Sequence, residues 1–149
     1  MKTLVAYYSL SGKTRKMCEK YVADTGAKFD LVEILEVNKR TTANAYLVGC
    51  PMALKQEASE IQKINIDMSL YDNVIIAGPI WAFNAPPALN AFLREYNLNG
   101  KSVTGVLTYA GTVGKAPSNF KAEIEKVGAI CKTVVTILPK DLENLSNII

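Results

Sequence analysis

Short apolar runs separated by glycine, proline and asparagine dominate the hydrophobic pattern of this chain. Five of them have the length and the β-branched, aromatic composition of strands, and they span residues 4–8, 29–35, 74–77, 103–109 and 130–138. The runs that begin at Leu4 and Val74 are apolar almost throughout, not only at alternate positions. This character is typical of strands that are covered on both faces, and it predicts a parallel sheet with helices on either side.

Three segments between these runs have helical periodicity. Apolar residues fall on one helical face after Gly12, after the Pro86-Pro87 pair, and around Phe120 and Ile124. Proline suits the first turn of a helix, so Pro87 is well placed to begin the second of these helices. The alternation of strand and helix predicts a three-layer, doubly wound α/β fold built on a five-stranded parallel sheet.

The segment 38–72 is harder to interpret than the rest of the chain. Ala58, Ile61 and Ile64 indicate a helix, whereas Gly49-Cys50-Pro51 is expected to interrupt whatever precedes it. A short closing helix is indicated at the end of the chain by four apolar residues, Leu142, Leu145, Ile148 and Ile149.

Composition narrows the possible functions. A length of 149 residues fits one domain, residues 1–149, and the absence of histidine excludes Ser-His-Asp and Cys-His catalysis and His-ligated zinc. The three cysteines have no metal-binding spacing, which suits a reducing compartment. A formal charge of +3 is too mild and too dispersed to indicate a nucleic-acid partner. No run has the length of a signal peptide or a membrane span, so we expect a cytoplasmic protein without membrane association.

Candidate chemistry lies in the loops that follow the strands, because ligands of open parallel sheets bind beyond the carboxyl ends of the strands. The first such loop holds two serines, a glycine and a threonine directly before a helix, in the sequence Ser9-Leu10-Ser11-Gly12-Lys13-Thr14. Hydroxyls and free N–H groups at a helix N-terminus suit a phosphate group. In isolation the same residues could serve only as a helix cap.

Two further loops contribute aromatic rings. The loop after the central strand holds Trp81 and Phe83 between prolines, and the loop after the next strand holds Tyr109 among glycines. Such rings can stack on a flat aromatic ligand, although Trp81 and Phe83 could instead only cover the sheet edge. A phosphate site and two aromatic walls on one sheet edge together describe a planar cofactor that carries a phosphate, and FMN fits this description.

These three loops resemble those of the flavodoxin family. The segment 9–14 is similar to the family's [ST]-x-[ST]-G-x-T phosphate loop, Gly78-Pro79-Ile80-Trp81 continues to Pro86-Pro87 as in the second flavin loop, and the segment 108–114 resembles the third. The resemblance covers most of the chain. It implies a sheet of strand order 2-1-3-4-5 and non-covalent FMN.

By this resemblance, three sets of residues bind the cofactor. The phosphate would be held through backbone amides and hydroxyls, and the flavin ring would lie between the second and third loops. The first loop supplies Ser9, Leu10, Ser11, Gly12, Lys13 and Thr14; the second supplies Pro79, Ile80, Trp81, Ala82, Phe83 and Asn84; the third supplies Thr108, Tyr109, Ala110, Gly111, Thr112 and Gly114. The redox chemistry would then belong to the flavin, and the protein would position it.

Two features depart from the family pattern. Many flavodoxins are strongly acidic and steer basic redox partners, whereas this chain has a sequence pI near 8.7. Many also have a glycine in the loop that faces the flavin, and residues 80–85 contain none.

The sequence leaves three functions open. The first is an electron carrier between larger redox enzymes, which the short chain favours, acting as a monomer or a weak homo-oligomer. The second is an NAD(P)H-dependent quinone or flavin reductase, in which a nicotinamide or quinone would contact the flavin. The third is a fold of this family that has lost the cofactor and serves as an interaction domain.

Overall fold

The computed structural model describes residues 2–25, 29–138, 140, 141 and 145. Its five strands form one parallel sheet in the order β2-β1-β3-β4-β5, which confirms the predicted topology. The strands are β1 (Lys2–Tyr7), β2 (Phe29–Glu33), β3 (Tyr71–Pro79), β4 (Ser102–Thr108) and β5 (Ile130–Ile137).

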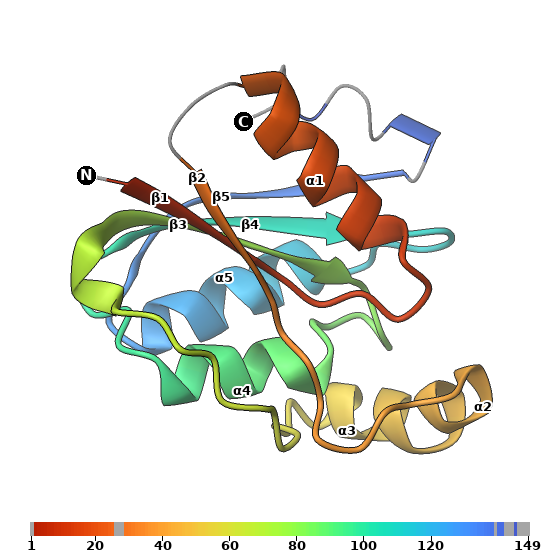
Figure 1. The fold of residues 1–149 in the computed structure, drawn as a ribbon. Helices are drawn as coiled ribbons and strands as arrows, with labels where there is room; N and C mark the ends of the chain where they lie inside the picture. The colour runs from red at the N-terminus through yellow and green to blue at the C-terminus, as the bar shows by residue number, and fades with distance from the viewer. Residues whose placement is uncertain (1, 26–28, 139, 142–144, 146–149) are drawn as a thin grey trace.

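Helices cover both faces of this sheet (Figure 1). One face is covered by α1 (Lys13–Thr25), and the other by α4 (Pro87–Glu95) and α5 (Ala116–Lys126). Alternate residues of β3 enter different cores: Ile75 packs with Met17 of α1, whereas Ile76 packs with Phe92 of α4 and Phe120 of α5. Both faces of the strand are therefore buried, which explains why its sequence is continuously apolar.

The structure of the segment between β2 and β3 differs from the sequence prediction. A helical run passes through Gly49-Cys50-Pro51 without a break, as α2 (Thr42–Asn44), the π-helix η1 (Ala45–Gly49) and α3 (Cys50–Leu54). Proline has no N–H and pushes on the carbonyl four residues earlier. The wider π-helical turn ends at Gly49, two residues before Pro51, and includes the Leu47 carbonyl, where such a disturbance is expected.

The helix predicted around Ala58, Ile61 and Ile64 is absent. The chain leaves α3 through Gln56 at a positive φ of 55°, and Ile61 forms an antiparallel bridge with Glu36. The Val37 N–H donates to the Glu60 carbonyl at 2.9 Å, and the Gln62 N–H to the Leu35 carbonyl at 2.7 Å. These long-range bonds replace the local bonds of a helix. The short 3₁₀-helix η2 (Met68–Leu70) then leads into β3.

The predicted closing helix lies outside the described residues except at one position. Leu145 is 2% exposed and joins the core between α1 and the sheet. Its burial agrees with an apolar anchor near the end of the chain.

A buried tyrosine, Tyr71, is expected to make the stability of the fold decrease as the pH rises in the alkaline range. The Tyr71 hydroxyl donates to Asp30 Oδ2 at 2.5 Å, and this bond together with burial raises the pKa of Tyr71 to about 12 from 10.0. A raised pKa stabilises the fold below the unfolded-state value and loses that contribution as pH rises through the folded-state value. We therefore expect the Tyr71 contribution to be complete below pH 10 and to fade toward pH 12.

This prediction is tested by measuring the free energy of unfolding between pH 9 and 12 for the unmodified chain and for Tyr71→Phe. The unmodified chain should lose more stability over this range. Parallel curves would show that the Tyr71 hydroxyl does not contribute.

Candidate functional site

A cavity of about 340 Å³ lies beyond the carboxyl ends of β1, β3 and β4. This volume lies at the lower end of the usual range for small-molecule sites. The three loops singled out in the sequence all contribute to its lining, and so does the helical run α2–η1–α3. The described lining residues are Leu10, Ser11, Lys13, Thr14, Thr42, Ala45, Tyr46, Cys50, Pro79, Ile80, Trp81, Ala82, Thr108, Tyr109 and Ala110.

One end of the cavity is the N-terminus of α1. The first helical hydrogen bond runs from the Lys16 N–H to the Gly12 carbonyl, at 3.1 Å. The N–H groups of residues 13–15 precede this bond and have no partner within the helix, and the helix dipole adds partial positive charge there. Gly12 has a φ of +88°, and nothing lies within 4 Å of the position a Cβ would occupy. This end of the cavity can therefore admit an anion close to the backbone.

Hydroxyl groups near the N-terminus of α1 have two different roles. The Ser9 Oγ accepts a hydrogen bond from the Gly12 N–H at 2.9 Å, so Ser9 shapes the loop. The Thr14 and Thr108 hydroxyl oxygens are 3.4 Å apart, and both residues are buried. Because the long distance makes this a weak contact, either hydroxyl can turn to bond a ligand.

A tight turn forms the edge of the cavity after β3. Trp81 and Asn84 exchange two backbone hydrogen bonds, at 2.9 and 3.0 Å. Ala82 and Phe83 between them have φ values of 48° and 64°, which non-glycine residues rarely adopt. The Asn84 Nδ2 donates to the Ala82 carbonyl at 3.2 Å, and the Asn119 Nδ2 donates to Asn84 Oδ1 at 2.9 Å. Side-chain amides thus stabilise a turn that would usually need glycine.

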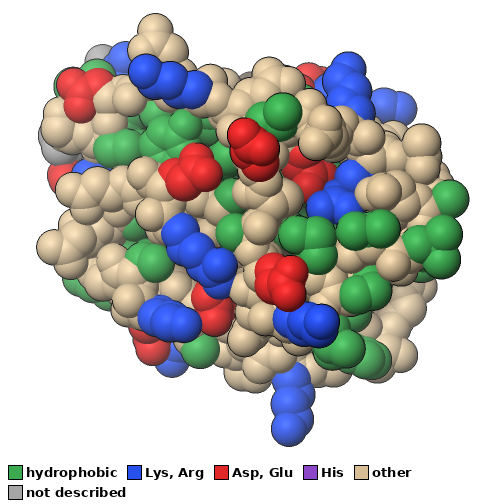
Figure 2. All heavy atoms as spheres, turned by 90° about the horizontal axis from the view of Figure 1, so that it is seen from below, with side chains coloured by type: hydrophobic (Ala, Val, Ile, Leu, Met, Phe, Trp, Pro, Cys, Tyr) green, Lys and Arg blue, Asp and Glu red, His purple; other side chains and the backbone are tan. Residues whose placement is uncertain are grey.

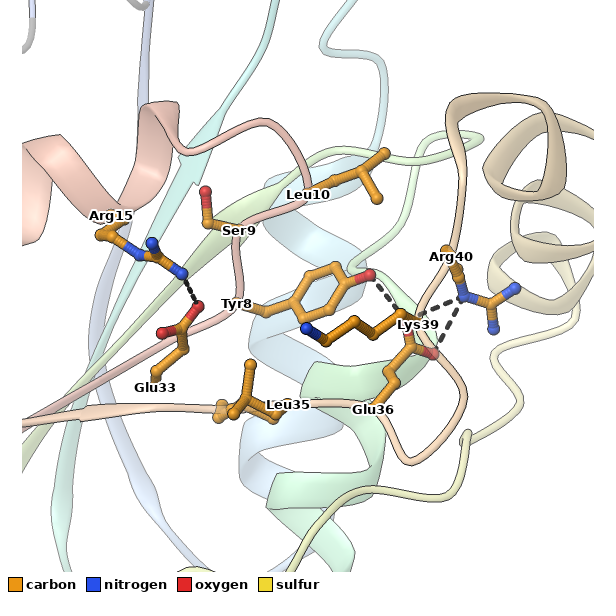
Figure 3. A pocket seen from close by; sticks show the side chains of 10 residues that line it. Tyr8, Ser9, Leu10, Arg15, Glu33, Leu35, Glu36, Lys39 and Arg40 are labelled. Atoms are coloured by element: carbon orange, nitrogen blue, oxygen red, sulfur yellow. Dashed lines mark hydrogen bonds and ion pairs between the residues drawn. The ribbon is translucent and has the colours of Figure 1, made fainter.

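Trp81 lies against a buried polar cluster, part of which is shown in Figure 3. Arg40 Nε donates to both carboxylate oxygens of Glu36 at 2.9 Å, and the Tyr8 hydroxyl donates to Glu36 Oε1 at 2.6 Å. The Arg40 and Glu36 side chains are only 8% and 5% exposed. The Tyr8 ring meets Trp81 edge-on at 5.7 Å, and the Arg40 guanidinium carbon lies 5.8 Å from the Trp81 ring centroid. The cluster fixes the position of the Trp81 ring.

A smaller pocket of about 210 Å³ lies beside this cluster, between the ends of β1 and β2 (Figure 3). Leu10 lines both this pocket and the larger cavity. Two of its charged side chains, Arg15 and Glu33, form an ion pair with each other.

The comparisons with known proteins agree with this architecture. The family model described as Flavodoxin matches residues 2–136. The chain belongs to the flavodoxin family. A search of curated protein sequences gives no significant match.

Solved structures similar to this flavodoxin-family chain cover nearly all of it. A provisionally assigned flavoprotein from Bacteroides eggerthii DSM 20697 has a TM-score of 0.80 and 25% identity, covering 99% of this chain and 97% of that one. A flavoprotein from Lactobacillus acidophilus NCFM, solved in complex with FMN, has a TM-score of 0.70 and 26% identity over 97% and 98%. Flavodoxin 2 from Bacillus cereus has a TM-score of 0.62 and 20% identity over 99% and 94%, and shows the same fold.

The structure brings most of the predicted site residues of this flavodoxin-family chain to the cavity, but not all of them. Gly12 and Ser9 shape the first loop without lining the cavity. The Phe83 ring packs over Gly114, lining a separate hollow with Asn84. Gly111 and Thr112 are exposed and also lie outside the lining. Successive residues of the tight turn after β3 point to different sides, which explains why Phe83 and Asn84 face the separate hollow and Trp81 faces the cavity.

The helical run supplies lining residues that sequence reasoning missed. Thr42, Ala45, Tyr46 and Cys50 all lie on α2–η1–α3. Burial raises the pKa of the Cys50 thiol, which disfavours the reactive thiolate. The sequence signal that could have found them is an uncharged stretch from residue 41 to 54, which is unusual for a helix facing only solvent.

Within the part of the chain that the structure describes, no group of three or more Cys, Asp, Glu or His could hold a metal ion. No helix among the described residues is long and apolar enough to cross a membrane.

Proposed function

We propose that this protein binds FMN without a covalent bond and carries electrons between redox proteins. The observation that carries the proposal is the meeting of three loops from distant parts of the sequence in one cavity, which is lined both by the first residues of a helix and by aromatic residues. The FMN complex of the Lactobacillus acidophilus flavoprotein, which is 26% identical, supports it.

The chemistry of the lining suits each part of FMN. The free N–H groups of residues 13–15 and the Thr14 hydroxyl would hold the phosphate. The Lys13 side chain lines the same end of the cavity and adds a positive charge. No Asp or Glu is among the described lining residues, so no carboxylate there opposes a dianionic group.

The other end suits an aromatic ring system. Tyr109 follows β4, Trp81 begins the turn after β3, and Tyr46 extends from η1, so aromatic side chains line the cavity from three elements. Edge-on and offset contacts between such rings and a flat ligand are favourable beyond the burial of area. When bound, FMN would supply the electron transfer, and these residues would orient it and exclude water from one side.

The proposal is tested by a visible absorption spectrum of the purified protein after FMN is added and the excess removed. Two flavin bands at about one equivalent per chain would support it. A folded sample without flavin would contradict it and favour an interaction domain. If the protein with bound flavin rapidly oxidises NAD(P)H with a quinone as acceptor, the result would contradict the carrier function and support a reductase.

The phosphate end is tested by Thr14→Val. Valine keeps the shape of threonine and removes the hydroxyl, so FMN binding should weaken by about 1.5–3 kcal/mol, the usual contribution of a hydrogen bond to a charged group. Dissociation constants from flavin fluorescence titrations measure this change. Thr112→Val is the matched control, because Thr112 lies in the third loop, is exposed and does not line the cavity. Equal affinities for both variants would place the phosphate elsewhere.

A further inference from the structure

The segments that line the cavity carry charges of one sign only. Four segments surround it: residues 9–16, 42–56, 79–87 and 108–119. Together they contain Lys13, Arg15, Lys16, Lys55 and Lys115, and no Asp or Glu. The remaining 12 of the 17 Lys and Arg are outnumbered by the 14 Asp and Glu, all of which lie outside these segments. Glu33 and Glu36 also lie at this edge of the sheet, but each is paired with an arginine, Arg15 and Arg40 respectively, so the lysines leave the edge with a net positive charge.

The edge of the sheet around the cavity keeps a net positive charge after ion pairing within the chain and after binding of a phosphate. Arg15 pairs with Glu33 of β2, whereas Lys13, Lys16, Lys55 and Lys115 have no ion pair among the described residues. A phosphate carries about two negative charges at neutral pH. Four lysines therefore leave this edge positive when FMN is bound.

Exposed apolar side chains lie beside these lysines and form what we call the apolar patch. It comprises Tyr46, Leu47 and Val48 of η1, Leu54 of α3, and Phe83 of the turn, each 46–77% exposed. Leu54, Phe83 and Lys115 line one hollow of about 420 Å³, and Ala82 lines both this hollow and the flavin cavity. Hydrophobic side chains gather at the right of the molecule in Figure 2, on the side where Figure 1 places α2 and α3.

The helical run that carries most of the apolar patch packs against Trp81 and the buried cluster. A Cβ on Gly49 of η1 would lie 2.7 Å from the Trp81 ring, so the helix and the ring already touch. Arg40 Nη1 donates to Asn44 Oδ1 at 2.9 Å, which joins the buried cluster to α2. Exposed apolar side chains with charged side chains beside them are the usual form of a protein interaction site.

We propose that the apolar patch and the lysines beside it form the docking surface for an acidic redox protein, whose carboxylates meet Lys55 and Lys115 while its apolar centre covers the patch. This inference rests on the proposed function. A second copy of the chain fits poorly, because two positive rims would repel each other. An acidic partner is steered toward the flavin edge by the same charges, which shortens the path for the electron.

The test uses a reduced plant-type ferredoxin as an acidic one-electron donor, whose potential is low enough to reduce a flavin. Each ferredoxin gives one electron, so two of them, with protons from water, reduce one FMN. Stopped-flow absorbance gives the second-order rate constant as a function of ionic strength. We expect this constant to fall as ionic strength rises.

Two doubly substituted proteins localise the effect. Lys55→Glu with Lys115→Glu should lower the rate constant about tenfold or more at low ionic strength, because steering by charge changes association rates by that order. Lys63→Glu with Lys132→Glu changes the net charge equally at exposed positions outside the four segments, and should have a much smaller effect. Equal losses in both proteins, or a rate that does not respond to salt, would overturn the proposal.

The contribution of the apolar patch to docking is tested separately. Leu47→Ser should slow ferredoxin oxidation while leaving its salt dependence unchanged. Leu70→Ser, at an exposed leucine of η2 outside the patch, should not slow it. A dimer in sedimentation velocity that Leu47→Ser dissociates would overturn the proposal in favour of a second copy. Flavin content is measured first for every protein. Normal flavin bands combined with failed docking would therefore overturn this inference and leave the proposed function standing.

Discussion

Replacing Arg40 by methionine should cost about 3–5 kcal/mol of the free energy of unfolding, the usual loss when one partner of a buried ion pair is removed. Methionine keeps most of the length of the arginine stem but removes the charge. It would leave Glu36, whose side chain is 5% exposed, with the Tyr8 hydroxyl as its remaining side-chain donor. It would also remove the cation beside the Trp81 ring, so FMN binding should weaken as well. Urea unfolding at pH 7 and an FMN titration measure the two effects.

Two further variants test whether the effect of Arg40→Met comes from the loss of a buried ion pair. Lys121→Met removes an ion pair with Glu125 whose side chains are 57% and 51% exposed, and it should cost well under 1 kcal/mol. Combining Glu36→Met with Arg40→Met removes both charges. The double variant should therefore lose less of the free energy of unfolding than the sum of the losses in the two single variants. If Arg40→Met were as mild as Lys121→Met, the cluster would not stabilise the fold in the way described.

The second large effect is expected for Gly49→Ala. Gly49 has helical angles, with a φ of −65°, so alanine by itself should favour the helix by about 1 kcal/mol. The added Cβ would however lie 2.7 Å from the Trp81 ring, closer than real Cβ contacts occur. The helix must move away from the ring, and overpacking of this kind costs about 1–3 kcal/mol. We therefore expect a net loss of stability and weaker FMN binding, measured by the same two titrations.

Gly111→Ala is the matched control, because nothing lies within 4 Å of its Cβ position and its φ is not positive. Adding Trp81→Leu to Gly49→Ala should relieve the clash and recover part of the stability. A stabilised Gly49→Ala protein would show that η1 does not rest on Trp81.

The strands, the three long helices and the three loops at the site could be predicted from the sequence, because their hydrophobic patterns and turn residues are local. The strand order came from the resemblance to the family. Continuous apolar runs predicted strands that are buried on both faces, and the packing of Ile75 and Ile76 into opposite cores confirms the reason. Hydroxyls and a glycine before α1 predicted its N-terminus, where Gly12 takes a φ of +88°.

The conformation of the segment between β2 and β3 and the directions of the aromatic rings depend on contacts between residues distant in sequence. Ile61 pairs with Glu36, and Gly49 meets Trp81, so residues far apart in sequence determine where this segment is helical and where it is extended. In the tight turn after β3, one ring packs against Tyr8 while the next aromatic residue, Phe83, packs over Gly114. Local periodicity cannot predict such an arrangement, because its stability comes from contacts that exist only after the sheet has formed.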